Sequence, residues 1–248
     1  MAGLGVLALW QPALAAGVFV DVAGELAFLT APQRRALSGR LVSSNGTETD
    51  ASIYVLDARF PRRSYALIEL HLPYVVTTQE TGLEYGLGDL LIRARARLYQ
   101  SPKRILHLLC TFRTGSGTSR VFPYASQSND LDFAIGYVDT LELFDLWASM
   151  GGAYVGRAPE SLPEDELHGH FGHVGAGIGI RATSGVTVGF SLSVAFFEGG
   201  RSREIYLGTL DYQRSQWLAL TISAHVEGSK REERVSDSAV AAGIRVFY

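Results

Sequence analysis

Cysteine, charge and long apolar runs are all scarce in this sequence. Cys110 is the only cysteine among the 248 residues, so an internal disulfide is excluded. No interior stretch of about 18 or more residues is apolar without interruption, which argues against transmembrane helices. Charged residues make up 19% of the chain, a low share for a soluble protein, and the net charge of −3 gives no sign of a nucleic-acid partner.

What the chain has instead is glycine, with 27 residues, and a strict two-residue rhythm. Residues 185–196 and 216–226 alternate apolar side chains with small or polar ones. The first segment has Val186, Val188, Phe190, Leu192, Val194 and Phe196 on its apolar face. A tilted strand needs about 9–11 residues to cross a bilayer, and these segments are long enough. They predict membrane-spanning strands with lipid on one face and water on the other.

Charges lie on the polar face of the earlier strands. In residues 88–99, Arg93, Arg95 and Arg97 alternate with apolar residues, and each would cost roughly 2–4 kcal/mol against mid-depth hydrocarbon. Neighbouring strands also have charged residues and histidines on this face. We therefore predict an interior lined by Asp57, Arg59, Glu69, His71, Asp89, Arg93, Arg95, Arg97, His107 and Arg113.

This predicted lining has two interpretations. Because basic residues outnumber acidic ones, it could favour the passage of anions or carboxylated solutes. Alternatively, the charges form a salt-bridged network that fills a narrow barrel, with Asp57, Glu69 and Asp89 as the acidic partners. The sequence favours the network, because a barrel of this size has room for side chains but not necessarily for a continuous channel.

The connections between these strands alternate in length. Short links at residues 61–63, 101–103, 140–141, 182–184 and 213–215 alternate with longer ones at 77–87, 114–129, 157–168, 198–202 and 228–236. Outer-membrane barrels have short periplasmic turns and longer outer loops. If the chain ends at the periplasm, one further strand is needed at the front; we place it at residues 35–43, with an outer loop at 44–50 and residues 18–29 as a rival.

The predicted fold is therefore all-β: a single closed antiparallel transmembrane β-barrel of about twelve strands, over residues 35–248. A soluble β-sandwich is the alternative, since it also has alternating strands and regular turns. The length of the strands and the charges deep on their inner face argue against it, because a soluble barrel would bury those charges in an apolar core.

Both ends of the chain carry export features. Residues 1–15 are predicted to be a signal peptide, because Ala13-Leu14-Ala15 fits the small-x-small cleavage rule after an apolar stretch, although no basic residue precedes Arg34. Residues 16–34 would then form an N-terminal periplasmic segment; a short buried hydrophobic segment is the alternative. The last strand, from Val240 to Tyr248, resembles the C-terminal insertion signal of outer-membrane barrels, which implies the barrel-assembly machinery as a partner.

Three short runs carry a family resemblance. They are Tyr54-Val55-Leu56-Asp57-Ala58-Arg59-Phe60, Leu72-Pro73-Tyr74-Val75 and Gly86-Leu87-Gly88-Asp89-Leu90, and residues 114–132 take the place of a long glycine-rich loop. Over roughly half its length the chain resembles the outer-membrane transporters grouped as "MetA-pathway of phenol degradation" proteins. The resemblance implies an outer-membrane barrel that passes small, aromatic solutes.

Metal, cofactor and catalytic sites are not expected. His168 and His170 share a strand face, but His173 falls on the opposite one, so the three histidines do not converge on a metal ion. No phosphate loop, zinc spacing or dinucleotide fingerprint occurs, so no cofactor is predicted. Glu164 and His170 lie in one loop without a placed serine nucleophile, so no residue is assigned a catalytic role.

The predicted function is passive or facilitated passage of a small, anionic or aromatic solute across the outer membrane of a Gram-negative cell. Outer-membrane lipid and that solute are the expected partners. Two alternatives stay open: a closed structural or adhesive barrel that presents its outer loops, and an enzyme at the barrel rim.

Overall fold

The computed structural model describes residues 35–45, 50–62, 65–79, 82–118, 121, 129–156, 169–196, 202–229 and 238–248. The predicted signal peptide, the periplasmic segment and the rival strand at residues 18–29 lie outside these ranges. Within the ranges, no helix has the length and apolar character that crossing a bilayer requires.

The described residues form thirteen strands and are otherwise turns and loops. The strands are β1 (Ala36–Asn45), β2 (Asp50–Arg62), β3 (Ala66–Gln79), β4 (Gly82–Leu87), β5 (Leu91–Gln100), β6 (Arg104–Arg113), β7 (Asp130–Thr140), β8 (Phe144–Val155), β9 (Gly169–Thr183), β10 (Val186–Phe196), β11 (Ser202–Gln213), β12 (Leu218–Ser229) and β13 (Ser238–Phe247).

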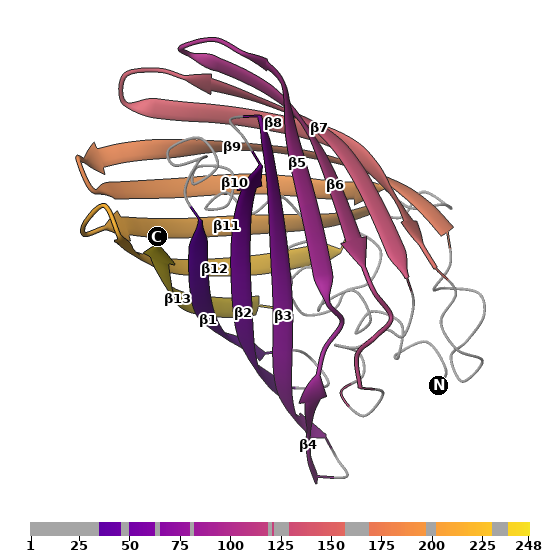
Figure 1. Cartoon of the computed structure of the whole chain (residues 1–248). Helices are drawn as coiled ribbons and strands as arrows, with labels where there is room; N and C mark the ends of the chain where they lie inside the picture. The colour runs from indigo at the N-terminus through magenta and orange to yellow at the C-terminus, as the bar shows by residue number, and fades with distance from the viewer. Residues whose placement is uncertain are drawn as a thin grey trace.

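These strands close into one antiparallel barrel (Figure 1). β1 pairs with both β2 and β13, which joins the two ends of the sheet. β3 pairs with β5 along one half and with β4 along the other, so β4 and β5 together occupy a single strand position in the barrel. The barrel therefore has twelve strand positions, as the sequence predicts, and β1 matches the strand expected at residues 35–43.

The two ends of the barrel differ in their connections. Tight turns join β2 to β3, β5 to β6, β7 to β8, β9 to β10 and β11 to β12, and the chain terminates at the same end (Figure 1). Longer connections, such as the one between β6 and β7, lie at the opposite end. Since outer-membrane barrels keep their short turns at the periplasm, the C-terminal end is the periplasmic end.

Residues 77–87 lie at the outer end, but they extend the strands as a hairpin and do not form the loop that the sequence predicts. β3 continues to Gln79, and β4 returns beside it with Thr77 opposite Glu84. Gly82 has a φ of 126°, a conformation that glycine tolerates and other residues rarely adopt, and it begins the returning strand. The alternating pattern simply continues beyond the expected strand end, so the hairpin extends further outward than the prediction allowed.

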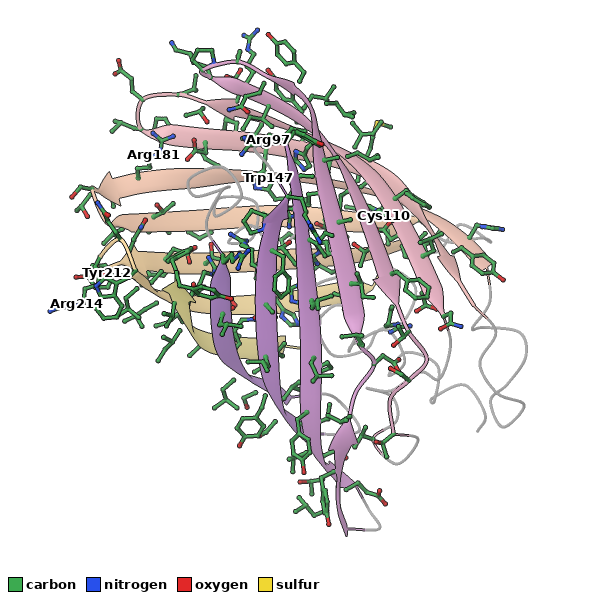
Figure 2. All side chains as sticks on the ribbon, in the orientation of Figure 1. Arg97, Cys110, Trp147, Arg181, Tyr212 and Arg214 are labelled. Carbon is green, nitrogen blue, oxygen red and sulfur yellow. The ribbon has the colours of Figure 1, made fainter. Side chains whose placement is uncertain are left out.

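Apolar side chains cover the outside of the barrel and polar ones fill much of the inside (Figure 2). Large exposed hydrophobic residues occur on the strands throughout the ring and include Leu41, Leu56, Leu72, Phe112, Ile135, Phe190, Leu210, Ile222 and Ile244. Such an outer surface is stable against hydrocarbon but not against water. The barrel is therefore a membrane-spanning one, and its exposed Leu108 and Phe112 place Cys110, between them in sequence, on the same lipid-facing side.

Candidate functional site in the barrel interior

Asp57 of β2 is the centre of a first ion-pair network on the inner face. Arg40 of β1 donates to both of its carboxylate oxygens, over 2.7 Å from Nε and 2.9 Å from Nη2. His71 of β3 lies with its Nδ1 2.5 Å from Asp57 Oδ1, and Ser38 donates from Oγ over 3.2 Å. The antiparallel register explains the meeting, because Asp57 lies directly opposite Ser38 on one side and His71 on the other.

Glu69 of β3 is the centre of a second network, two residues nearer the periplasmic end. Arg59 of β2 donates to Glu69 Oε1 over 2.7 Å, and Arg95 of β5 donates to Oε2 over 3.1 Å. Arg93 lies directly opposite Glu69 in the β3–β5 register. Arg93 and Arg95 are 2% and 1% exposed, so the inner face is closely packed here. We call the residues of both networks, with Arg93, the basic cluster: Arg40, Asp57, Arg59, Glu69, His71, Arg93 and Arg95.

On the inner face of the remaining wall, the described residues include three further ion pairs between strands. Arg113 of β6 pairs with Asp130 of β7. His173 of β9 lies with Nε2 2.7 Å from Asp132 Oδ1 of β7, and both residues are buried. Arg181 of β9 donates from Nε to Asp145 of β8 over 3.1 Å. The sequence prediction missed Arg40, Asp130, Asp132, Asp145, His173 and Arg181 as interior residues, although each lies on the small-or-polar face of an alternating segment.

The other predicted lining residues lie away from these networks. Arg97 is half-buried near the periplasmic end, where the strand register shifts, and donates to Gln100 Oε1 over 2.8 Å. His107 is buried on β6 against Gly136. Asp89 is buried between β4 and β5 and accepts a hydrogen bond from the backbone N–H of Gly117 over 2.9 Å. The predicted set thus divides into the basic cluster and several separate contacts.

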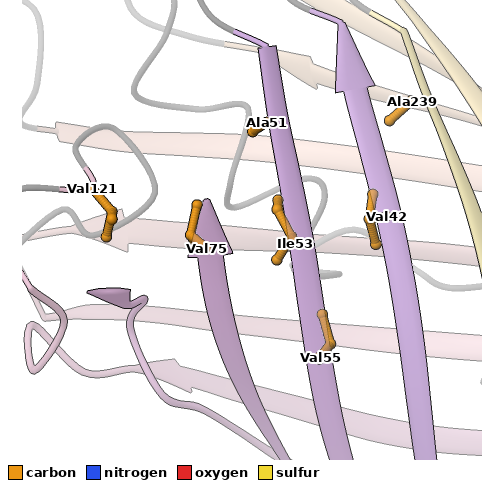
Figure 3. Packing of buried hydrophobic residues seen from close by; sticks show 7 residues of the cluster. All are labelled: Val42, Ala51, Ile53, Val55, Val75, Val121 and Ala239. Atoms are coloured by element: carbon orange, nitrogen blue, oxygen red, sulfur yellow. The ribbon is translucent and has the colours of Figure 1, made fainter. Parts of the chain in front are cut away.

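Toward the outer end, the inner face of the same strands becomes apolar (Figure 3). On β2, Ile53 and Val55 are buried on the inner face, and Asp57 and Arg59 follow on the same face toward the periplasmic end. They belong to a cluster that draws on β1, β2, β3 and β13 and on the connection after β6: Val42, Ala51, Ile53, Val55, Val75, Val121 and Ala239. We call this set the outer apolar cluster.

Val121 belongs to the connection between β6 and β7, and it is fully buried in the outer apolar cluster. The preceding residues are held against the strand position shared by β4 and β5. Thr118 N–H donates to Leu87 O over 2.7 Å, next to the hydrogen bond between Gly117 N–H and Asp89. Gly86 makes this possible, because a Cβ there would lie 2.8 Å from Thr118 Cβ. The Gly-x-Gly-Asp-Leu segment therefore holds the β6–β7 connection in place.

Among the described residues, His170 and His173 do not form a shared site. His170 is exposed and its ring lies 5.2 Å from the ring of Tyr154, centroid to centroid, whereas His173 is buried on the inner face. His168 lies outside the described residues. Across the described ranges, no three histidine, cysteine, aspartate or glutamate residues are placed to hold a metal ion.

The sequence matches no family model, and no curated protein matches it. The fold, by contrast, is shared with solved outer-membrane proteins. An outer-membrane channel of Pseudomonas putida F1 superposes with a TM-score of 0.70 at 9% identity, covering 87% of this chain and 96% of that one. The NanC porin gives 0.61 at 7% identity, over 86% and 99% of the two chains. The translocator domain of the autotransporter NalP from Neisseria meningitidis gives 0.59 at 9% identity, over 96% and 99%.

Identities this low establish the fold and no more. That fold, a closed antiparallel barrel with an apolar outer surface, is the architecture of outer-membrane proteins. The chain is therefore an outer-membrane β-barrel.

Proposed function

We propose that this barrel is a narrow channel for the passive or facilitated passage of a small solute, with a preference for anionic or carboxylated ones. The observation that carries the proposal is the composition of the basic cluster, in which four arginines accompany two carboxylates. Guanidinium groups on the inner wall of a channel favour the passage of negatively charged solutes.

The close packing of the inner face limits the size of that solute. Leu67, Arg93 and Arg95 are each at most 2% exposed, so these positions leave little room around the side chains. Further out, any solute would pass the outer apolar cluster with the buried Val121. Small unit currents and small solutes are therefore expected, and an aromatic carboxylate would suit both the apolar and the basic sections.

The resemblance to the "MetA-pathway of phenol degradation" transporters supports the same reading, as does the channel or porin description of two barrels that share the fold. We further propose that the C-terminal strand directs assembly. Val240, Ile244 and Tyr248 are exposed on its outer face, as an insertion signal read by the barrel-assembly machinery would require.

Recording from the purified protein in a planar bilayer under a salt gradient tests the proposal. We expect small, steady single-channel currents and a reversal potential that indicates anion preference. A protein that inserts but carries no steady current would contradict passage. The buried arginines and Val121 would then support the second candidate, a closed barrel that presents its outer loops.

A further inference from the structure

Exposure differs between the two sides of the barrel interior. On β3 and β5, the inward side chains of Glu69, Arg93 and Arg95 are almost completely buried. On β12, β13 and β1, the central inward residues are only half-buried: Thr221, Ser223, His225, Ala241, Gly243, Arg245, Ser38 and Arg40. They alternate with exposed apolar residues such as Leu220 and Ile244, which shows that they point inward. The accessible part of the interior therefore borders β12, β13 and β1.

A small recess lies in this side of the inner wall, where β13 has little side-chain volume. The recess measures about 20 Å³, and a cavity of that volume admits one small polar group of about the size of a water molecule. We call it the inner recess. The inward residues that line it are Ser38 and Arg40 of β1, Thr221 and Ser223 of β12, and Ala241, Gly243 and Arg245 of β13.

Gly243 allows Arg40 to lie across β13. The two residues are opposite each other in the β1–β13 register, and a Cβ on Gly243 would lie 2.7 Å from Arg40 Cγ. The aliphatic part of Arg40 therefore packs over the glycine, while its guanidinium binds Asp57 of β2. Arg245 follows two residues later on the same face of β13. Two arginines from neighbouring strands thus border one recess.

Positive charge predominates in the lining of the inner recess. Among the described residues, the charged ones that line it are Arg40 and Arg245. The carboxylate of Asp57 accepts from Arg40, and that of Asp211 accepts from Thr221 Oγ1 over 2.6 Å. A guanidinium has five N–H donors, so an arginine that binds one carboxylate can also donate to a second. The lining of the recess therefore suits an anionic oxygen.

We propose that the inner recess binds the carboxylate group of a solute in transit, with Arg40 and Arg245 as the cationic groups that recognise it. This inference rests on the proposed channel function and names the binding site for its solute. The recess admits the carboxylate end and not a ring, so the rest of the solute stays in the lumen. Guanidinium groups form charge-assisted hydrogen bonds to carboxylates, so the recess distinguishes a carboxylate from a neutral group of similar shape.

Benzoate added to planar bilayers containing the wild-type channel tests the recess through the concentration that halves the potassium chloride current. Arg245→Gln removes one guanidinium, and Ser223→Val fills the recess without changing the charge. We expect each variant to raise the half-blocking concentration of benzoate about tenfold, the change that loss of one hydrogen bond to a charged group produces. Benzamide, which has the same shape without the charge, should act equally on the wild type and on Arg245→Gln.

Two variants are matched controls for these changes. Arg35→Gln removes the same charge at an exposed position just before β1. Ala224→Val adds volume on the outward face of β12, next to Ser223 in sequence. Benzoate should block both controls as it blocks the wild type.

An unchanged benzoate block in either Arg245→Gln or Ser223→Val overturns the recess while leaving the channel proposal intact, and so does an equal change for benzamide in Arg245→Gln. If the wild type carries no current, the channel proposal fails instead. Calorimetric titration of benzoate into the detergent-solubilised protein then tests the recess, with binding heat expected for the wild type and not for Arg245→Gln. Equal heats, or no heat in the wild type, overturn it there as well.

Discussion

Arg59 and Glu69 face each other directly across the β2–β3 pair, and the guanidinium donates to the carboxylate over 2.7 Å. Both side chains are buried, so their charges depend on each other and on Arg95 for compensation. This relationship determines the first expected result, since a buried ion pair behaves very differently from one at the surface.

Glu69→Gln should destabilise the barrel by about 3–5 kcal/mol, because it leaves two buried arginines without their carboxylate. Thermal unfolding in detergent, followed by the loss of sheet signal, measures the change. Arg104→Gln is the control: its contact with Asp139 spans 3.4 Å at a periplasmic turn, and the Arg104 side chain is 60% exposed. It should cost about 0–1 kcal/mol. Similar losses in both variants would show that Glu69 is not a compensating group.

The double variant Arg93→Gln and Arg95→Gln should lower anion preference, because it removes two of the four arginines of the basic cluster. We expect the anion-to-cation permeability ratio to fall about twofold or more, as read from the reversal potential under a salt gradient. Adding Arg97→Gln should contribute little, since Arg97 is half-buried near the periplasmic end and contacts Gln100. Arg214→Gln, at an exposed turn, should leave the ratio unchanged, and a ratio that does not respond to the double variant rejects these arginines as selectivity residues.

Gly86→Val should displace the β6–β7 connection, because even a Cβ at this position lies 2.8 Å from Thr118 Cβ. Val121 would then lose its place in the outer apolar cluster. We expect faster cleavage within residues 114–129 by added protease and a conductance raised by roughly twofold, if the connection narrows the outer end. Gly39→Val is the control, since nothing lies within 4 Å of its Cβ position. Identical cleavage and conductance in Gly86→Val and wild type would show that this contact does not hold the connection.

Leu56→Arg should impair assembly, because Leu56 is 57% exposed on the outer face of β2 and an arginine there would meet hydrocarbon. A lipid-facing arginine costs roughly 2–4 kcal/mol near mid-depth and less toward either interface. The folded fraction on an unheated gel reports the effect. Leu56→Ala, which removes apolar area without adding charge, should fold as the wild type does. Normal folding of the arginine variant would place this face away from lipid.

Alternation along the strands predicted the barrel and its faces correctly, because each side chain must lie on one side of a single wall. It identified the inward positions of Arg93 and Arg95 for this reason. It does not predict pairing between strands, so the contacts of Arg40 with Asp57 and of Asp132 with His173 could not be predicted. Register between strands depends on turn geometry and on bulges such as the one after Arg97.

Side chains that reach across several strands were hardest to predict. Trp147 was not singled out, because the reason for its position is the absence of side chains at Gly175 and Gly177 on the next strand. Val121 belongs to a connection without periodicity, so its burial follows only from backbone contacts that the sequence pattern does not encode.

The shared pairing of β3 has a practical consequence for engineering. In the described chain β4 pairs with β3 alone and occupies the same strand position as β5, so it does not widen the barrel. The hairpin can therefore be lengthened between Gln79 and Gly82 without altering the number of strand positions in the barrel. An epitope inserted there would be displayed outside the cell at the end of the β3–β4 hairpin, which makes this the natural position for labelling the protein in living bacteria.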